Sequence, residues 1–319
     1  MTPQLPSYAE ENAFVHSSRI QRVPGTKRPR SFPTDSLRHT VKMYRRDNLR
    51  WVKWWLSLHR TTEMRRSLKS VQNAYAGRPA LVMGNGPSTS ALHSSDISAF
   101  VANGGHLFTV NHVFEHGRLQ LQQIFCHTLS DPKSIDHVRT PGSPMSKFFA
   151  STEINYLSVP DCQSNRHRQL LPSQHILPFC DSEIRTAGWK KSRSIRPDRP
   201  RSYLSLTVYK ALALAIWMGH DPIYIVGIDN TYVRDLYCGP NNEIILRQRH
   251  FYGESQPGDY SLLYASVGDL VYELAMAFSD LDKFSAENII NLDPFSLTDA
   301  FRKVPTLKHA SEVLTSVRT

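Results

Sequence analysis

A glycine-rich turn at residues 84–88 is the stretch of this sequence best suited to chemistry. The apolar residues 80–83 lead directly into Gly84-Asn85-Gly86-Pro87-Ser88. Two glycines let the backbone turn sharply and approach a ligand closely, and Ser88 or Ser90 can cap a following helix. Unpaired amides and a helix dipole at such a turn favour an anion, so we expect nucleotide phosphates here. The alternative is a tight strand-to-helix turn that holds no ligand, because neither a third glycine nor a Gly-Lys-Ser/Thr sequence follows.

Further polar residues stand where other strands are expected to end. Asn111, His127 and Asp229 each follow or close an apolar run, and helical patterns separate these runs. Apolar strands that alternate with helices indicate a mostly parallel sheet with helices on both faces, an α/β Rossmann-like fold. Ligands of such sheets bind at the carboxyl ends of the strands. We therefore expect Asn85, Asn111, His127 and Asp229 at one edge.

The expected elements fill one domain over residues 80–303, followed by a C-terminal tail at 304–319. A long basic surface loop is expected at 181–201, and Gly219 is expected to end a strongly apolar helix. Three helices are expected, at 92–102, 203–218 and 260–280. Six strands are expected, at 80–83, 106–111, 121–127, 154–159, 222–229 and 288–292.

The positive charge is concentrated at the N-terminus. Residues 1–80 hold 16 Lys/Arg and 5 Asp/Glu, whereas the remainder holds 22 and 23. The main domain is therefore not a globally basic nucleic-acid binder, and no nucleic-acid partner is expected. Residues 1–34 are rich in Pro, Ser and basic residues and are expected to form a flexible arm.

Residues 35–79 are expected to form a basic amphipathic helical extension. Trp51, Trp54, Trp55 and Leu58 form an apolar strip at helical spacing, surrounded by lysines and arginines. Such a helix can lie in an anionic membrane interface, or it can pack its tryptophans on the core and leave its charges in water. Binding to nucleic acid is a third alternative.

Several protein classes are excluded by composition. No apolar run reaches the length of a transmembrane helix, and the N-terminus lacks the pattern of a secretory signal. The four cysteines, Cys126, Cys162, Cys180 and Cys238, form no C-x-x-C pair, so neither a zinc site nor a disulfide framework is indicated. We expect a cytoplasmic protein that can attach peripherally to the inner face of the membrane.

The order of the motifs resembles a known family. The turn at 84–88 is followed by Val110-Asn111, then by Met218-Gly219-His220 and Ile-Tyr-Ile-Val-Gly-Ile-Asp at 223–229, then by His-Phe-Tyr-Gly at 250–253 and Asn-Leu-Asp-Pro-Phe-Ser-Leu at 291–297. This order resembles the bacterial sialyltransferases of glycosyltransferase family 42, which build lipooligosaccharide ends. It is also similar to the broader group of motility accessory proteins and 6-hydroxymethylpterin pyrophosphokinases. The resemblance covers residues 80–303.

The resemblance implies an inverting transfer from a CMP-sugar donor, with no obligatory metal and no cofactor beyond this co-substrate. Carried over position by position, Asn85 and Asn111 hold the nucleotide, Ser205 and Thr207 lie near the donor at a helix start, and Tyr232 and Tyr237 bind the leaving phosphate. Gly84, Gly86, Pro87, Ser88 and Asp229 complete the expected nucleotide site.

The catalytic base is the point at which this sequence departs from the family. The family pattern is His-Tyr-Ile-Gly-His, whereas residues 250–254 are His-Phe-Tyr-Gly-Glu. Either His250 or Glu254 can take the proton of the acceptor hydroxyl, because a histidine or a carboxylate serves as general base. Arg247 and Arg249, close before His250, are candidates for a cationic lid over the phosphate.

The expected acceptor is a cell-surface glycan or its lipid-linked precursor. A pyrophosphokinase that uses Mg²⁺ and ATP is one alternative, and a non-catalytic protein that binds through its basic N-terminus is another. The Asp280-Leu281-Asp282 sequence resembles a metal motif but is expected at a helix end rather than after a strand, so no metal site is expected. The oligomeric state stays open, with a homo-oligomer as one option.

Overall fold

The computed structural model describes residues 37–56, 62–115, 123–130, 134–181, 195–200, 206–230, 236–238, 244–247, 260–264, 281, 284 and 288–316. The expected flexible arm at 1–34 lies outside these residues, as do most of the loop at 181–201 and both aspartates of the Asp280-Leu281-Asp282 sequence.

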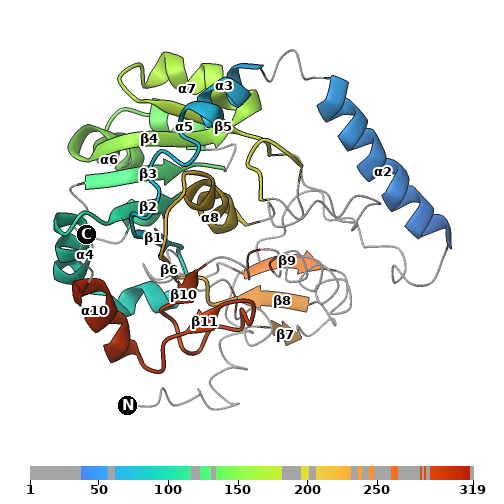
Figure 1. Ribbon diagram of the computed structural model, residues 1–319. Helices are drawn as coiled ribbons and strands as arrows, with labels where there is room; N and C mark the ends of the chain where they lie inside the picture. The colour runs from blue at the N-terminus through green and yellow to red at the C-terminus, as the bar shows by residue number, and fades with distance from the viewer. Residues whose placement is uncertain are drawn as a thin grey trace.

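The core of the fold is an eight-stranded sheet in which every described pairing is parallel, in the order β11-β10-β6-β1-β2-β3-β4-β5 (Figure 1). The prediction of an α/β fold with a mostly parallel sheet is thus confirmed. Its strands are β1 (Ala80–Met83), β2 (His106–Val110), β3 (Gln123–Thr128), β4 (Glu153–Pro160), β5 (Ile176–Phe179), β6 (Ile223–Val226), β10 (Ile289–Asn291) and β11 (Arg302–Lys303).

Both faces of the sheet are covered by helices because the strand side chains are apolar on both sides. On β1, Ala80 and Val82 pack with α3 (Thr62–Ser70) and α8 (Thr207–Trp217), whereas Leu81 and Met83 pack on the opposite face. Among the described helices, that opposite face carries α4 (Ser94–Ala102), α6 (Pro144–Ser151) and α10 (Leu307–Ser316). Strands buried on both faces give the continuous apolar runs from which the parallel sheet was predicted.

The helix α8 is buried almost all round, and its residues from Val208 to Ala215 have little or no exposed surface. It ends where expected, because Gly219 has a φ of +88°, and the amides of Gly219 and His220 donate to the carbonyls of Ile216 and Ala215. This pattern of two closing hydrogen bonds satisfies the last carbonyls of the helix and requires a left-handed residue after it.

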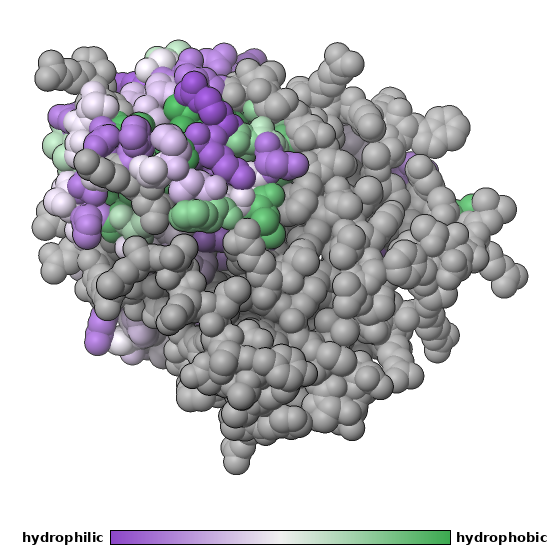
Figure 2. All heavy atoms as spheres, turned by 90° about the horizontal axis from the view of Figure 1, so that it is seen from below, coloured by the Kyte–Doolittle hydropathy of each residue, from purple (hydrophilic) through white to green (hydrophobic). Residues whose placement is uncertain are grey.

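Apart from the N-terminal helix at Leu37–Leu56, the other described helices are short and connect the strands. They are α5 (Ser134–Arg139), α7 (Ser164–Leu170) and the single 3-10 turns η2 (Pro87–Ala91), η3 (Val113–Glu115) and η4 (Asp161–Gln163). Seen from below in Figure 2, the described side chains are mostly polar, with smaller apolar areas among them.

Three expectations about single elements are wrong. The helix expected from residue 92 begins at Ser94, because η2 and a short extended stretch precede it. The helix expected at 260–280 begins with a strand, β9 (Tyr260–Tyr264), which pairs with β8 (Ile244–Arg247) in a three-stranded antiparallel sheet completed by β7 (Leu236–Cys238). Strand 288–292 is not the last, since β11 follows it and pairs with it.

The segments expected to flank the domain are partly packed against it. Helix α3 contributes the buried side chains of Met64 and Leu68 to the same core as α8. At the other end, α10 buries Ala310 and Leu314 against the face that carries α4, so residues 307–316 are a packed helix rather than a tail. Helix α2 (Leu37–Leu56) precedes α3, and Figure 1 shows it at the periphery of the molecule.

Candidate active site

The candidate site lies where the order of the strands reverses. From β1 the chain adds β2 to β5 on one side, and then returns to place β6 on the other side of β1. The loops that follow β1 and β6 are therefore far apart in the sequence, but they start side by side at the carboxyl edge of the sheet. In open parallel sheets this reversal point is where ligands bind.

The glycine-rich turn after β1 packs directly against the loop after β6. The amide of Gly84 donates to Val226 at 2.8 Å, and the amide of Gly86 donates to Gly227 at 3.0 Å. A Cβ on Gly84 would lie 2.3 Å from the carbonyl oxygen of Gly227, and one on Gly86 would lie 2.0 Å from Oδ2 of Asp229. The glycines are thus needed for the close approach of two loops of the chain itself.

Ser88 joins the two loops through its backbone and its side chain. Its amide donates to Oδ1 of Asp229 and its hydroxyl donates to Oδ2, both at 3.0 Å, while its Oγ accepts the amide of Gly227 at 2.9 Å. Ser88 therefore caps no helix, contrary to expectation, and Ser90 instead donates to the carbonyl of Pro87. The cap of α4 is His93, with Asp96 completing a capping box.

These contacts change the interpretation of the turn as an anion site. The expected site needed unpaired amides, but the amides of Gly84, Gly86 and Ser88 all donate to acceptors within the protein. The cradle formed by the turn is filled by the loop after β6. Asn85 is the member of this turn that keeps a polar atom unused, since its Oδ1 is buried and has no hydrogen-bond partner among the described residues.

Asp229 forms a carboxyl pair with Asp293, which follows β10. Burial, together with the carboxylate of Asp293, raises the pKa of Asp229 to about 6, although the hydrogen bonds from Ser88 act in the opposite direction. Asp293 is 3% exposed and accepts the amide of Phe295 at 2.9 Å. Sequence reasoning missed Asp293 as a site residue, although its position directly after a buried strand was the same signal that identified Asp229.

A second polar cluster joins the ends of β2 and β3 to the start of α8. The side-chain amide of Asn111 donates to Oγ1 of Thr207 at 3.0 Å, and Oδ1 of Asn111 accepts the amide of Ser130 at 3.2 Å. The hydroxyls of Ser130 and Thr207 are also hydrogen-bonded to each other. Asn111 adopts a φ of +44°, a left-handed conformation that asparagine tolerates better than most residues.

This cluster brings together two of the predicted nucleotide-site residues from distant parts of the sequence. Thr207 stands in the first turn of α8, where amide groups and the helix dipole favour negative charge. Asn85 belongs to the same edge, because Met83 pairs with Thr109 and both asparagines come two residues later. Ser130 was not predicted, since its only sequence signal is its place just after β3.

His127 does not face the candidate site. It is fully buried within β3, its Nδ1 is hydrogen-bonded to the hydroxyl of Thr109 at 2.8 Å, and it packs against Phe148 and Phe149. Burial lowers the pKa of His127 to about 3, so it stays neutral in the folded protein. His127 therefore serves the packing between the sheet and α6 rather than catalysis.

The predicted catalytic residues fall mostly outside the described part of the chain. His250, Glu254 and Tyr232 lie outside it, and Tyr237 is described only as part of the backbone of β7; Ser205, predicted for the nucleotide site, also lies outside it. Their catalytic and binding roles stay predictions. Among the residues that the structure does describe, no three His, Cys, Asp or Glu side chains converge as metal ligands.

The tie between the two loops gives a testable expectation for stability. Replacement of Ser88 by alanine removes a hydrogen bond to the half-buried carboxylate of Asp229 and leaves the amide of Gly227 without its acceptor. The backbone amide of residue 88 and its bond to Asp229 are retained, so we expect a loss of about 2 kcal/mol in the free energy of unfolding, measured by urea denaturation. Ser90→Ala is the matched control, since Ser90 is exposed and should change stability by less than about 0.5 kcal/mol. Equal effects of the two substitutions would contradict this account.

Comparisons with known proteins give distant similarities. No family model and no curated protein matches the chain. One similar solved structure is the sialyltransferase CstII from Campylobacter jejuni, in complex with the substrate analogue CMP-3FNeuAc, at 14% identity and a TM-score of 0.39; the match covers 72% of this chain and 86% of that one. Another is the MAf glycosyltransferase from Magnetospirillum magneticum AMB-1, at 13% identity and a TM-score of 0.40, covering 76% of this chain and 38% of that one.

Both solved structures are glycosyltransferases of the groups that the sequence motifs resemble.

Proposed function

We propose that this chain is an inverting glycosyltransferase that uses a CMP-sugar without a metal ion. The observation that carries the proposal is the cluster of Asn111, Ser130 and Thr207 at the first turn of α8, with Asn85 on the same sheet edge. Amide and hydroxyl groups of this kind can hydrogen-bond a nucleobase, a ribose and a phosphate. The start of a helix supplies the favourable potential for the phosphate.

The reaction needs a base, a stabilised leaving group and a site that holds the donor and the acceptor in line. In the proposed mechanism, His250 or Glu254 takes the proton of the acceptor hydroxyl, and the resulting oxygen attacks the anomeric carbon. The bond from that carbon to the nucleotide phosphate breaks, and Tyr232 and Tyr237 donate hydrogen bonds to the departing phosphate. The acceptor is a cell-surface glycan or its lipid-linked precursor, reached from the inner face of the membrane.

Nucleotide binding is the first test of this proposal. CMP, CDP, UDP, GDP and ATP are each added with and without Mg²⁺, and the unfolding temperature is followed. A ligand at 100 times its dissociation constant stabilises the fold by about 2.7 kcal/mol. We expect a response to CMP that does not require Mg²⁺.

The role of the cluster is tested with Thr207→Val, which removes a hydroxyl and keeps the side-chain shape. We expect this variant to bind CMP roughly tenfold more weakly, because one hydrogen bond to the cluster or the ligand is lost. Thr140→Val, at an exposed hydroxyl directly after α5, is the matched control. A response to UDP or GDP would replace the donor, and a response only to ATP with Mg²⁺ would favour the pyrophosphokinase. The absence of any response would favour the non-catalytic alternative.

A further inference from the structure

Helix α2 presents an apolar face to the outside. Among the described residues, six large apolar side chains are highly exposed, and five of them lie on this one helix. They recur at helical spacing and are between 49% and 64% exposed: Val41, Leu49, Val52, Trp55 and Leu56. Exposed apolar side chains are common singly, but a group gathered on one helix face marks an interaction surface.

The same helix is strongly basic. It carries six Lys/Arg residues and one acidic residue, and the acidic one, Asp47, is 2% exposed and paired with Arg46. Arg45 and Lys53 are exposed beside the apolar residues. The outward side of α2 therefore combines apolar and positive groups. Its natural partner has an apolar interior beneath a negatively charged surface.

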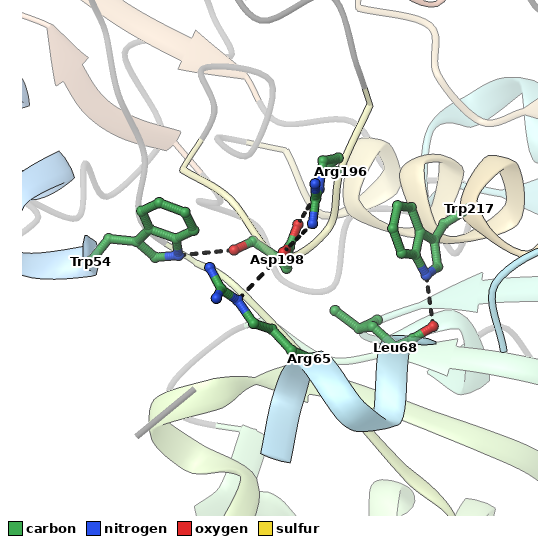
Figure 3. A network of polar contacts seen from close by, with 6 residues as sticks. All are labelled: Trp54, Arg65, Leu68, Arg196, Asp198 and Trp217. Carbon is green, nitrogen blue, oxygen red and sulfur yellow. Dashed lines mark hydrogen bonds and ion pairs between the residues drawn. The ribbon is translucent and has the colours of Figure 1, made fainter. Parts of the chain in front are cut away.

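The inward side of α2 is held by the segment at 195–200 and by α3. Nε1 of Trp54 donates to the carbonyl of Asp198 at 2.9 Å, and the carboxylate of Asp198 is paired with Arg196 and Arg65 (Figure 3). The guanidinium of Arg65 also lies 5.3 Å from the ring of Trp54. These contacts fix which side of the helix faces outward.

The segment that contains Asp198 adjoins the end of β5. The carbonyl of Pro197 accepts the amide of Cys180, the residue that directly follows this strand, at 2.8 Å. The guanidinium of Arg196 lies 5.6 Å from the ring of Trp217 on α8. Nε1 of Trp217 in turn donates to the carbonyl of Leu68 on α3 (Figure 3). The segment that anchors α2 therefore contacts the residue after β5, through Pro197, and the C-terminal end of α8, through Arg196.

We propose that the outward face of α2 binds the surface of an anionic lipid bilayer. Its apolar side chains enter the boundary between headgroups and acyl chains, and its basic residues contact the negative headgroups. None of the described helices is long and apolar enough to cross a bilayer. If the proposed transferase function holds, the acceptor is presented by the same membrane.

The test is sedimentation of the full chain with lipid vesicles. Neutral phosphatidylcholine vesicles are compared with vesicles that contain roughly a third phosphatidylglycerol, at low and at raised salt. We expect binding to the anionic vesicles that weakens with salt. Replacing both Arg45 and Lys53 by glutamine should weaken it roughly 30-fold, from the loss of two charges near the surface. Replacing both Trp55 and Leu56 by serine should weaken it at least roughly tenfold.

Matched substitutions elsewhere serve as controls. Phe295→Ser removes an apolar side chain that is 68% exposed but lies after β10, and Arg139→Gln with Lys147→Gln removes two exposed basic residues from α5 and α6. Both should leave vesicle binding unchanged. Equal binding to neutral and anionic vesicles, or equal losses in test and control variants, would overturn the proposal.

Two further measurements complete the test. The first shows whether the outward face of α2 binds a membrane or a second copy of the chain, and the second separates this proposal from the proposed nucleotide site. Light scattering gives the mass in solution, and a dimer that dissociates on replacement of Trp55 and Leu56 would assign this face to a second copy of the chain instead. The thermal response to CMP, measured on the same variants, should be retained. A retained CMP response with lost vesicle binding supports the membrane surface, whereas vesicle binding without any CMP response would leave the surface intact and reject the nucleotide site.

Discussion

A Gly84→Ala variant is expected to lose about 3 kcal/mol or more of its free energy of unfolding. The added Cβ would lie 2.3 Å from the carbonyl oxygen of Gly227 and 2.9 Å from its carbonyl carbon. Both are backbone atoms at the end of β6, so the clash cannot be relieved by rotating a side chain. The two loops must separate, and the hydrogen bonds between Gly84 and Val226 and between Gly86 and Gly227 weaken with them. Urea denaturation followed by circular dichroism measures the loss.

Gly142→Ala is the control for this prediction. Gly142 has a φ of +77°, but nothing lies within 4 Å of the position that its Cβ would take. Its replacement therefore introduces backbone strain alone, which costs about 1 kcal/mol. A Gly84 variant no less stable than the Gly142 variant would show that the two loops are not in contact as described.

The strands were predictable where local pattern and global packing agree. Strand β1 was predicted with its observed bounds, because four apolar residues end at a glycine. Strand β5 was missed, since it has four residues and contains Pro178. A proline is tolerated there because β5 is the edge strand of the sheet, a property that is set by the order of the strands and not by the sequence nearby. Strand β9 was predicted as part of a helix from its local sequence, but its residues pair with β8 in an antiparallel sheet.

The polar residues of the site were predictable as positions but not as contacts. Asn111, Thr207 and Asp229 lie at strand ends or at a helix start, and a parallel sheet gathers such positions at one edge. Their partners Ser130, Ser88 and Asp293 depend on how separate loops meet. For the same reason the sequence could not reveal that the amides of the glycine-rich turn already have acceptors within the protein. The loop that supplies these acceptors follows the turn by about 140 residues; Ser88 and Asp229, for example, are 141 residues apart.

Acid is expected to destabilise the protein steeply between pH 6.5 and about pH 4. Burial lowers the pKa of His106 and His220 to about 4 and that of His127 to about 3, from an ordinary value of 6.5. Below pH 6.5 the unfolded chain takes up protons at these histidines while the folded chain does not, so stability falls as the pH falls. Each such group contributes up to about 1.4 kcal/mol per pH unit.

One carboxyl acts in the opposite sense over the same range. The pKa of Asp229 is raised to about 6, so the folded chain takes up this proton before the unfolded chain does, and stability is gained as the pH falls from 6 towards 4. Three histidines against one carboxyl leave a net slope of at most about 2.7 kcal/mol per pH unit, and water around the partly exposed His106 reduces its share. His167 and Asp161 have shifts whose effects on stability oppose each other, since burial lowers the pKa of the first and raises that of the second.

The slope can be assigned to particular histidines by substitution. His127→Leu removes one titrating group from an apolar environment beside Phe148 and Phe149, so the slope should fall by about 1.4 kcal/mol per pH unit even where the variant is less stable at neutral pH. The slope is obtained from the free energy of unfolding in urea at half-unit steps of pH. His309→Leu, at an exposed position on α10, is the control substitution. If His127→Leu leaves the slope unchanged, this histidine is protonated to the same extent in the folded and the unfolded chain. That result would contradict the description of His127 as a buried, neutral histidine beside Phe148.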